Sequence, residues 1–299
     1  MKREIVVIGA GVAGMTSAIY LKRAGINPLI IEMSRPGGQI NFAPLVENFP
    51  GYLSITGRDF SKKVYEQLES LEIEYLKDEV LSVTKRDDYF VIELKNNEVI
   101  TAENIIIATG KKIKKLDIPN VNSFLGVGLS YCATCDGKFF EGKDVLVVGD
   151  TNKALEESIY LANLCNKVYV LCENDSVKAD SFYKDKVLSI DNIEIIYNAR
   201  LKELVKDDTL KSALIIKDDK EVLLNVSGCF AYVGYLPNSE LFSSLVELNG
   251  DNYIIVNRDK ETSCKGIYAV GDVTDTKVYQ LVTACGDAAI AVDSYLSSK

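Results

Sequence analysis

One short motif near the start of the chain limits the fold more than any other feature. An apolar run, Glu4–Ile8, leads into the glycine turn Gly9-Ala10-Gly11-Val12-Ala13-Gly14. Residues with helical spacing follow from Met15 to Ala24, and a second apolar run, Pro28–Ile31, ends at Glu32. Strand, glycine turn, helix and strand in this order predict a βαβ unit with a parallel sheet.

The glycine turn also predicts a ligand. Glycines allow a tight turn and a close approach of the backbone to a pyrophosphate, and the helix N-terminus adds N–H donors and partial positive charge. Glu32 follows about 20 residues later, where an acidic side chain accepts hydrogen bonds from a ribose. We expect Gly9, Gly11, Val12, Ala13 and Gly14 to bind a dinucleotide. The alternative is a glycine-rich turn without a ligand.

A second unit of the same kind lies in the middle of the chain. Asp144–Val148 is a predicted strand, Gly149–Ala154 a turn, Ala154–Leu164 a helix and Lys167–Leu171 the next strand. Two such units predict two nucleotide-binding-like domains. Further elements are predicted at Tyr89–Leu94, Asn104–Ala108, Ile193–Tyr197, Cys229–Val233 and Gly266–Val270 (strands) and at Thr283–Leu296 (helix). We expect one domain from both chain ends, 1–111 and 235–299, with the second, 112–234, inserted into it.

Composition and charge exclude several classes of function. Apolar residues make up 47% and charged residues 26% of the 299, which is typical of a globular protein. The net charge of −9 argues against a nucleic-acid partner, and no apolar run is long enough to span a membrane. The basic and apolar N-terminus superficially resembles a signal peptide, but its glycines indicate a strand that enters a helix. We therefore expect a cytoplasmic protein.

The cysteines contain one motif. There are seven, an odd number that argues against a structural disulfide framework, and five of them are isolated, as small buried hydrophobic residues often are. Cys132 and Cys135 are spaced i, i+3, which puts both sulfurs on one side of a helical turn, close enough to bridge. A helix N-terminus would lower the pKa of one thiol. The alternatives are half of a metal site or two core cysteines, but without histidine or a second Cys-x-x-Cys we expect no metal.

Five motifs occur in the order found in bacterial thioredoxin reductases, which the chain resembles over its whole length. They are Gly37-Gly38-Gln39, Glu47-Asn48-Phe49-Pro50-Gly51, Ala108-Thr109-Gly110, Cys132-Ala133-Thr134-Cys135-Asp136 and Gly271-Asp272-Val273. The resemblance implies an α/β fold with two Rossmann-like domains of the three-layer ββα type, FAD as cofactor, and a homodimer. The cofactor-binding residues that it implies are Gly37, Gly38, Gln39, Asn48, Ala108, Thr109, Gly110, Gly271, Asp272, Gln280 and Leu281.

The resemblance also assigns roles at the cysteine motif. Cys135 is the flavin-facing sulfur, and Cys132 is the sulfur that attacks the disulfide of thioredoxin. Asp136 is the expected proton donor and acceptor, because the chain has no histidine. As an alternative or in addition, Asp136 caps a helix.

The second turn departs from the family pattern. Relatives that use NADPH carry Gly-x-Gly-x-x-Ala or Gly there, followed by arginines that hold the 2′-phosphate. Here Asp150 and Thr151 stand in the turn, Glu173 and Asn174 replace arginines, and Lys178 replaces a further one. Two lost charge-assisted contacts cost roughly 1.5–3 kcal/mol each. The deficit of about 3–6 kcal/mol corresponds to roughly two to four decades of affinity.

The missing NADPH contacts point to another electron donor. The chain looks most like the ferredoxin-dependent flavin thioredoxin reductases of clostridia, which implies ferredoxin as donor and partner. One alternative is an NADH-dependent thioredoxin reductase, because Glu173 could accept ribose hydroxyls as Glu32 does. Another is a diflavin-type disulfide oxidoreductase with a different protein substrate. A redox-sensing module that binds FAD without turnover is a fourth, which the intact Cys132, Cys135 and Asp136 argue against.

Two further features have two interpretations each. Lys111, Lys112, Lys114 and Lys115 form a basic run that suits an acidic ferredoxin, or is a solvated linker. Tyr279 precedes Gln280 where NADPH-dependent relatives tend to have Arg-Gln, and it either stacks near the flavin or packs elsewhere.

Overall fold

The computed structural model describes residues 2–43 and 45–299, which form two compact units. Unit 1 consists of residues 1–112 and 236–299, and unit 2 of residues 113–235. The chain passes between them along β7 (Lys111–Ile113) and β16 (Tyr235–Pro237), which pair with each other. These bounds lie within one residue of those expected from the sequence, and unit 2 is inserted into unit 1.

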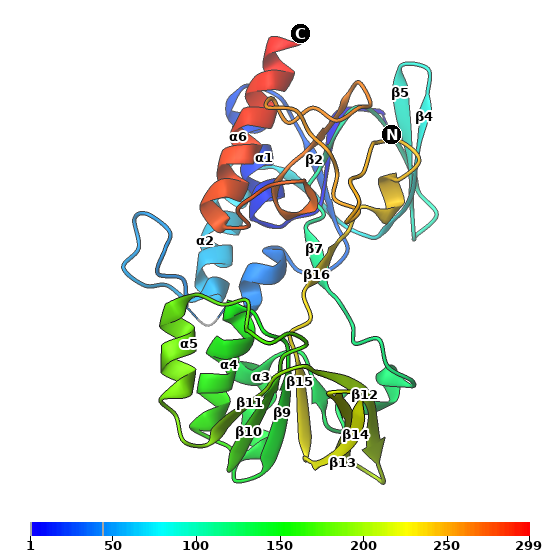
Figure 1. Cartoon of the computed structure of the whole chain (residues 1–299). Helices are drawn as coiled ribbons and strands as arrows, with labels where there is room; N and C mark the ends of the chain where they lie inside the picture. The colour runs from blue at the N-terminus through cyan, green and yellow to red at the C-terminus, as the bar shows by residue number, and fades with distance from the viewer. Residues whose placement is uncertain (1, 44) are drawn as a thin grey trace. The chain divides into compact units, whose positions relative to one another are not determined.

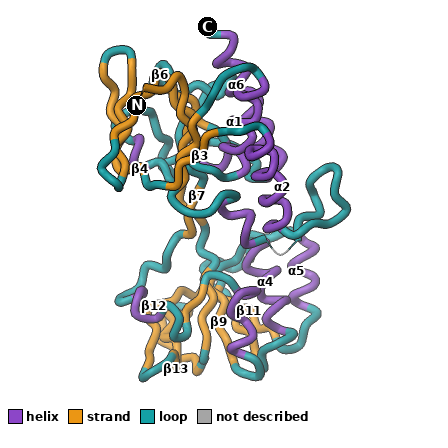
Figure 2. Tube along the Cα trace, turned by 180° about the vertical axis from the view of Figure 1, so that it is seen from behind, coloured by secondary structure: helices purple, strands orange, loops and turns teal. Residues whose placement is uncertain are grey.

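Unit 1 is a three-layer α/β domain. Its parallel strands have the order β3-β2-β1-β6-β17, and β6 also pairs with the antiparallel strands β5 and β4. Figures 1 and 2 both show the long helices on one side of this sheet. The strands are β1 (Lys2–Ile8), β2 (Leu29–Glu32), β3 (Glu74–Lys77), β4 (Val80–Arg86), β5 (Tyr89–Leu94), β6 (Val99–Ile107) and β17 (Ile267–Ala269). The helices are α1 (Val12–Arg23), α2 (Gly57–Ser70) and α6 (Leu281–Ser297), with 3-10 turns η1 (Gly38–Phe42), η4 (Glu240–Phe242) and η5 (Gly271–Val273).

Unit 2 repeats this architecture at a smaller size. Five parallel strands have the order β11-β10-β9-β15-β8, and an antiparallel β12-β13-β14 sheet covers one face. The strands are β8 (Leu129–Ser130), β9 (Asp144–Val148), β10 (Lys167–Leu171), β11 (Ile193–Ile196), β12 (Ala199–Lys206), β13 (Leu210–Lys217), β14 (Lys220–Asn225) and β15 (Gly228–Ala231). The helices are α3 (Ala133–Asp136), α4 (Asn152–Ala162) and α5 (Ser181–Leu188), with 3-10 turns η2 (Val121–Phe124) and η3 (Gly137–Phe140). The predicted fold of two Rossmann-like domains is confirmed.

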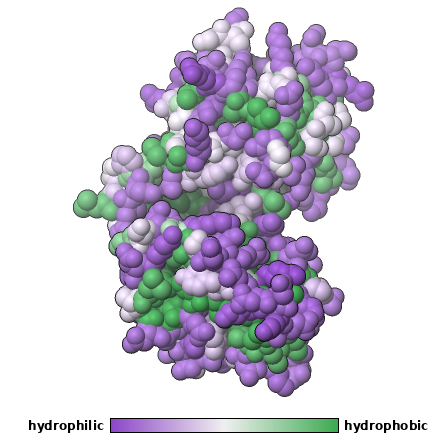
Figure 3. All heavy atoms as spheres, viewed as in Figure 1, coloured by the Kyte–Doolittle hydropathy of each residue, from purple (hydrophilic) through white to green (hydrophobic). Residues whose placement is uncertain are grey.

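Each unit has two hydrophobic layers, one on each face of its sheet. In unit 1 the helix side contains Met15 and Tyr295, and the other side contains Phe90 and Phe242. The C-terminal ends of β1 and β6 and most of β9 are apolar and buried, because parallel strands are covered on both faces. Figure 3 shows apolar atoms over the helical side of unit 2, where Phe182 and Leu188 of α5 are exposed. Among the described residues, no helix has the length and apolarity that crossing a bilayer requires.

The first helix begins earlier than its spacing predicts. We expected a helix from Met15, but α1 starts at Val12, and Gly14 lies inside it. A Cβ on Gly14 would lie 1.9 Å from the backbone oxygen of Gly9, so glycine is required where the helix crosses the end of β1. The fourth helix likewise begins at Asn152 rather than at Ala154. The last residues of each glycine turn, from Val12 and from Asn152 on, therefore form the first turn of the helix that follows.

Candidate functional site

The cysteine motif of unit 2 forms a disulfide at the start of a short helix. Cys132 and Cys135 are bonded, with their Cα atoms 5.3 Å apart. Cys132 is the N-cap of α3, and its Sγ accepts a hydrogen bond from the backbone N–H of Cys135 at 3.2 Å. Across the described part of the chain, no cluster of three Cys, Asp or Glu side chains could hold a metal ion. The two sulfurs are therefore bridged, as their spacing predicts.

Asp136 is held by a residue that sequence reasoning missed. The Ser130 hydroxyl, at the end of β8, donates a hydrogen bond to Oδ2 of Asp136 at 2.6 Å. This is the shortest contact of the hydroxyl. The Ser130 hydroxyl oxygen also accepts the N–H of Cys132 at 3.0 Å. The side chain of Asp136 caps no helix in the described structure, because Cys132 caps α3. Ser130 lies two residues before Cys132, at the end of β8, which pairs with β15, and no motif marks it.

The glycine turn of unit 1 has space for a ligand at one of its three glycines. Gly9 adopts φ +102°, and a Cβ there would lie 2.4 Å from the Ala108 oxygen, so this glycine is needed for packing. Gly14 is needed for the helix crossing described above. Gly11, the N-cap of α1, has no protein atom within 4 Å of a Cβ position and no side-chain cap. Val12 and Ala13 form the buried first turn that follows.

Glu32 points back to this turn. Its Oε2 accepts the N–H of Ala10 at 2.8 Å, and its Oε1 accepts the N–H of Ser34 at 2.8 Å. A carboxylate offers about four acceptor positions, so capacity for ribose hydroxyls remains. The open space at Gly11, the free helix N-terminus and this acceptor together fit a dinucleotide.

The other predicted cofactor residues come from distant parts of unit 1 and meet around the same turn. Gly37 bridges to Gly11 and donates to the Ala10 oxygen at 2.7 Å, with Gly38 beside it. Asn48 donates to the side chain of Gln280, 232 residues away, at 3.0 Å. Gln280 caps α6, which Leu281 begins.

The remaining predicted residues extend this cluster along the sheet edge. Ala108 continues β6 by donating to the Ile8 oxygen at 2.8 Å. Thr109 and Gly110 pair with Asn238, and a Cβ on Gly271 would lie 2.9 Å from Ala13. The exposed Gln39 donates to the backbone oxygen of Lys111.

The lysines of the predicted basic run differ in their contacts. Lys111 lies 2.8 Å from the carboxylate of Asp272, its side chain is only 12% exposed, and its ammonium sits 4.1 Å from the centroid of the Tyr279 ring. Lys112 pairs with Glu240 at 2.8 Å. Lys111 is thus shielded from solvent among the predicted cofactor residues, and the run does not present four exposed charges. Burial, followed by a hydrogen bond with Tyr253, raises the pKa of Tyr279.

The second glycine turn, in unit 2, is crowded by its own side chains. Gly149 adopts φ +139° and packs under the Tyr232 oxygen. Asp150 adds a carboxylate that accepts a contact from the buried Cys172 thiol at 3.8 Å, and Thr151 occupies the position equivalent to Gly11. Burial is the main cause of the raised pKa of Cys172.

The loop after β10 closes over this turn. Thr151 bridges to Lys178, and Asn152 exchanges two hydrogen bonds with Asp180, at 2.6 and 2.7 Å. Glu173 and Asn174 are exposed at the point where a 2′-phosphate would need cations.

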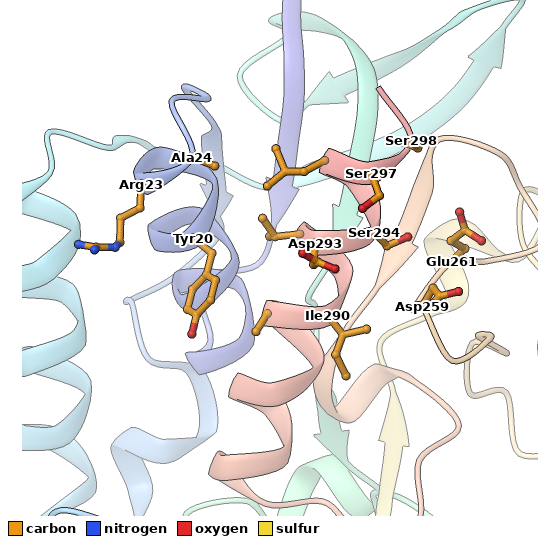
Figure 4. Close-up of a pocket in the computed structure, with 13 residues that line it drawn as sticks. Tyr20, Arg23, Ala24, Asp259, Glu261, Ile290, Asp293, Ser294, Ser297 and Ser298 are labelled. Atoms are coloured by element: carbon orange, nitrogen blue, oxygen red, sulfur yellow. The ribbon is translucent and has the colours of Figure 1, made fainter.

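A broad surface hollow of about 910 Å³ lies elsewhere on unit 1 (Figure 4). Tyr20 of α1, Asp293 and Ser294 of α6, and Asp259 and Glu261 of the opposite loop line it. It lies toward the C-terminal ends of α1 and α6, whereas the glycine turn meets the N-terminus of α1. Its acidic lining also argues against a phosphate, so we do not assign the cofactor to it.

Comparison with known proteins defines the class. The family profile described as "Pyridine nucleotide-disulphide oxidoreductase" matches residues 3–289. The thioredoxin reductase of Bacillus subtilis is 35% identical, over 97% of this chain and 93% of its own length. A "34.2 kDa protein in rubredoxin operon" of Clostridium pasteurianum is 34% identical, over 99% and 98%. The crystal structure of Lactococcus lactis thioredoxin reductase matches with a TM-score of 0.91 and 34% identity, over 98% of both chains.

These matches span nearly the whole chain, both in sequence and in fold. The chain belongs to the thioredoxin reductases of low molecular weight, within the pyridine nucleotide-disulphide oxidoreductases. The family resemblance drawn from the motifs is therefore confirmed, and the clostridial ferredoxin-dependent subtype stays a prediction.

Proposed function

We propose that this chain is an FAD-dependent reductase of thioredoxin disulfide that takes its electrons from reduced ferredoxin. The observation that carries the disulfide chemistry is the Cys132–Cys135 bond at the start of α3, beside a carboxylate held by Ser130. The family membership supports the substrate class, because the relatives named thioredoxin reductase span the same length.

The residues around Gly11 would hold FAD. The helix N-terminus would bind the pyrophosphate, Glu32 would accept ribose hydroxyls, and the exposed amides of Gln39, Asn48 and Gln280 would be available to the rest of the cofactor. When bound, FAD supplies a carrier that collects single electrons from a donor and delivers them in pairs to a disulfide. The partly shielded ion pair of Lys111 and Asp272 would place fixed charges beside the cofactor.

Opening the disulfide needs two electrons and leaves two sulfurs that need stabilisation. The N–H of Cys135 points at the Sγ of Cys132, so the thiolate forms most readily on Cys132. Cys132 then attacks a sulfur of thioredoxin, its sulfur–sulfur bond forms, and the thioredoxin disulfide breaks. Asp136 supplies the proton to the sulfur that leaves. Cys135 then attacks the Cys132 sulfur of the mixed disulfide, which re-forms the Cys132–Cys135 bond and releases the second thioredoxin sulfur as a thiol.

Exposure alone would assign the two sulfurs differently. Cys135 is the more exposed of the pair, whereas Cys132 is half-buried. The nucleophilicity of a cysteine depends more on thiolate formation than on the exposed area of its side chain, which favours Cys132 as the attacking sulfur. In Cys135→Ser the remaining Cys132 should form a stable mixed disulfide with thioredoxin, and Cys132→Ser should not. The reverse pattern would reassign the attacking sulfur.

A protein substrate also fits the surface next to the redox helix. Phe139, in the η3 turn directly after α3, is 74% exposed. An exposed aromatic side chain beside a reactive disulfide suits a protein partner, since aromatics supply much of the binding energy at interfaces.

The second turn supports the choice of donor. Thr151 and Asp150 crowd the place where a nicotinamide dinucleotide would put its pyrophosphate, and exposed Glu173 repels a 2′-phosphate. A one-electron protein donor needs no such site.

Anaerobic titration of the flavin absorbance tests the donor. Reduced ferredoxin should bleach the oxidised flavin rapidly, and thioredoxin should restore it. NADPH and NADH at micromolar concentration should leave it unchanged. Rapid bleaching by NADPH would rule out the ferredoxin proposal, and bleaching by NADH alone would favour the NADH-dependent alternative.

A further inference from the structure

We infer that the second glycine turn of unit 2 now supports the redox helix, through Lys153, Glu157 and the hydroxyl of Tyr232. Tyr232 is the positioning residue at the end of this chain of contacts. The inference deepens the proposed disulfide chemistry and rests on it.

The first contact joins Tyr232 to the redox helix. Its hydroxyl oxygen accepts the backbone N–H of Ala133, the first residue of α3, at 2.8 Å. Ala133 is completely buried, so without this acceptor its N–H would lack both water and a protein partner. The backbone of Tyr232 is fixed as well, because its N–H donates to Val148 at 2.7 Å and its oxygen lies over Gly149.

The second contact joins Tyr232 to α4. The hydroxyl faces the carboxylate of Glu157, which raises the pKa of the phenol in addition to the larger effect of burial. The Glu157 side chain is only 5% exposed, and its Oε2 is buried with no hydrogen-bond partner of its own among the described residues. A phenol that accepts the Ala133 N–H still has its own proton to donate, and we infer that the partnerless Oε2 of Glu157 is the acceptor for it.

The third contact anchors Glu157 in the turn. Lys153, one helical turn earlier, lies 2.6 Å from Oε1 of Glu157. Burial opposes the charge on Lys153, but the Glu157 and Glu156 carboxylates outweigh it and raise its pKa. Lys153 belongs to Gly149–Ala154, the counterpart of the turn that faces the proposed flavin in unit 1. A cation within this turn therefore fixes the carboxylate that orients Tyr232.

The support matters most when the disulfide is open. In the oxidised state the sulfur–sulfur bond itself constrains α3. Once reduced, the helix depends on Ser130 and on Tyr232 to keep the Cys135 N–H pointed at the Cys132 sulfur. Loss of the Tyr232 hydroxyl should loosen this geometry and raise the pKa of the Cys132 thiol.

Alkylation of Cys132 tests the inference without flavin, ferredoxin or thioredoxin. The full chain with Cys135→Ser is treated with iodoacetamide across pH, and the fraction modified at Cys132 is measured by mass spectrometry. Tyr232→Phe should move the midpoint up by about 0.5–1 pH unit, roughly a 3- to 10-fold loss of thiolate at neutral pH. Glu157→Gln keeps an acceptor and should stay close to the parent, whereas Glu157→Ala should follow Tyr232→Phe.

Tyr131→Phe is the matched control. The Tyr131 hydroxyl also accepts a buried backbone N–H in unit 2, that of Leu116 at 3.1 Å, but it does not hold the redox helix. All variants keep Asp136, the carboxylate on the same turn. Equal midpoints for Tyr232→Phe and Tyr131→Phe would overturn the inference. If Tyr232→Phe does not fold, Glu157→Ala decides: an unshifted midpoint overturns it. Failure of ferredoxin to reduce the flavin would leave this experiment unaffected.

Discussion

The two glycine turns share a framework and differ in what they leave open. In each unit the first glycine packs under a backbone oxygen at 2.4 Å from its virtual Cβ, Ala108 for Gly9 and Tyr232 for Gly149. In each, the third position of the turn bridges to the loop after the next strand, Gly11 to Gly37 and Thr151 to Lys178. Backbone geometry is therefore preserved in both.

The difference lies in side chains that face the helix N-terminus. Unit 1 presents Gly11 and open space, whereas unit 2 presents Asp150, Thr151 and the Lys153–Glu157 pair. In such a βαβ turn the first glycine therefore preserves the backbone fold, and the next glycine leaves the space that a ligand needs. The turn of unit 2 has kept the fold but not the space for a ligand. Its Lys153 instead pairs with Glu157, next to the Tyr232 hydroxyl that we infer supports the redox helix.

The largest expected effect comes from filling the space at Gly11. Gly11→Val should fold normally, because no protein atom lies within 4 Å of the new Cβ, but it should weaken FAD binding at least ~100-fold by blocking the pyrophosphate. Flavin absorbance after gel filtration measures retention, and circular dichroism reports the fold. Thr151→Val, at the equivalent place in unit 2, is the control and should retain FAD. If the Gly11→Val protein retained a full complement of FAD, the assignment of this turn as the FAD site would be wrong.

The next effect comes from reopening the second turn. Asp150→Gly with Thr151→Gly should strengthen NADH binding by about 10-fold, because one repulsive charge and one side chain leave the pyrophosphate position. Adding Glu173→Arg and Asn174→Arg should bring NADPH affinity up by roughly two to four decades. Equilibrium titration of each nucleotide measures both. No gain in the fourfold variant would mean that the closed loop, and not these side chains, excludes the nucleotide.

A smaller effect is expected from the shielded cation of unit 1. Lys111→Met leaves the carboxylate of Asp272 without its partner beside the proposed flavin, which disfavours the electron-rich reduced cofactor. The flavin midpoint potential should fall by about 30 mV, measured by dye equilibration. Lys112→Met, which removes an exposed partner of Glu240, is the control and should leave the potential unchanged. Equal potentials in both variants would place Asp272 away from the cofactor.

The smallest effect concerns the cysteines outside the motif. Burial raises the pKa of Cys165 to about 11 and that of Cys229 to about 12, in Cys165 with a smaller contribution from Asp144. At pH 8 their thiolate fractions would be roughly one in a thousand and one in ten thousand. The oxidised native protein should therefore stay unmodified at both under iodoacetamide, and labelling should appear only after denaturation. Native labelling of Cys229 would show that the core of unit 2 opens readily.

Much of the fold followed from local patterns. The strands β5, β9 and β10 match their expected bounds, since each is an apolar run closed by polar or glycine residues. The antiparallel β12-β13-β14 sheet and α2 were not anticipated, because their outward faces are polar and their pairing depends on contacts far along the chain. Helix starts were misplaced where glycine serves packing rather than a turn, as at Gly14.

The sequence alone determined the class of this protein. Glycines, cysteines and their spacing are local and few, so they identify a nucleotide turn, a redox pair and a damaged second turn without coordinates. Tertiary structure decided which side chains support them. Lys111 reaches Asp272, and Tyr232 reaches Ala133, only because the fold brings distant segments together. Such partners lie many residues apart at no fixed spacing, so only the folded chain can reveal them.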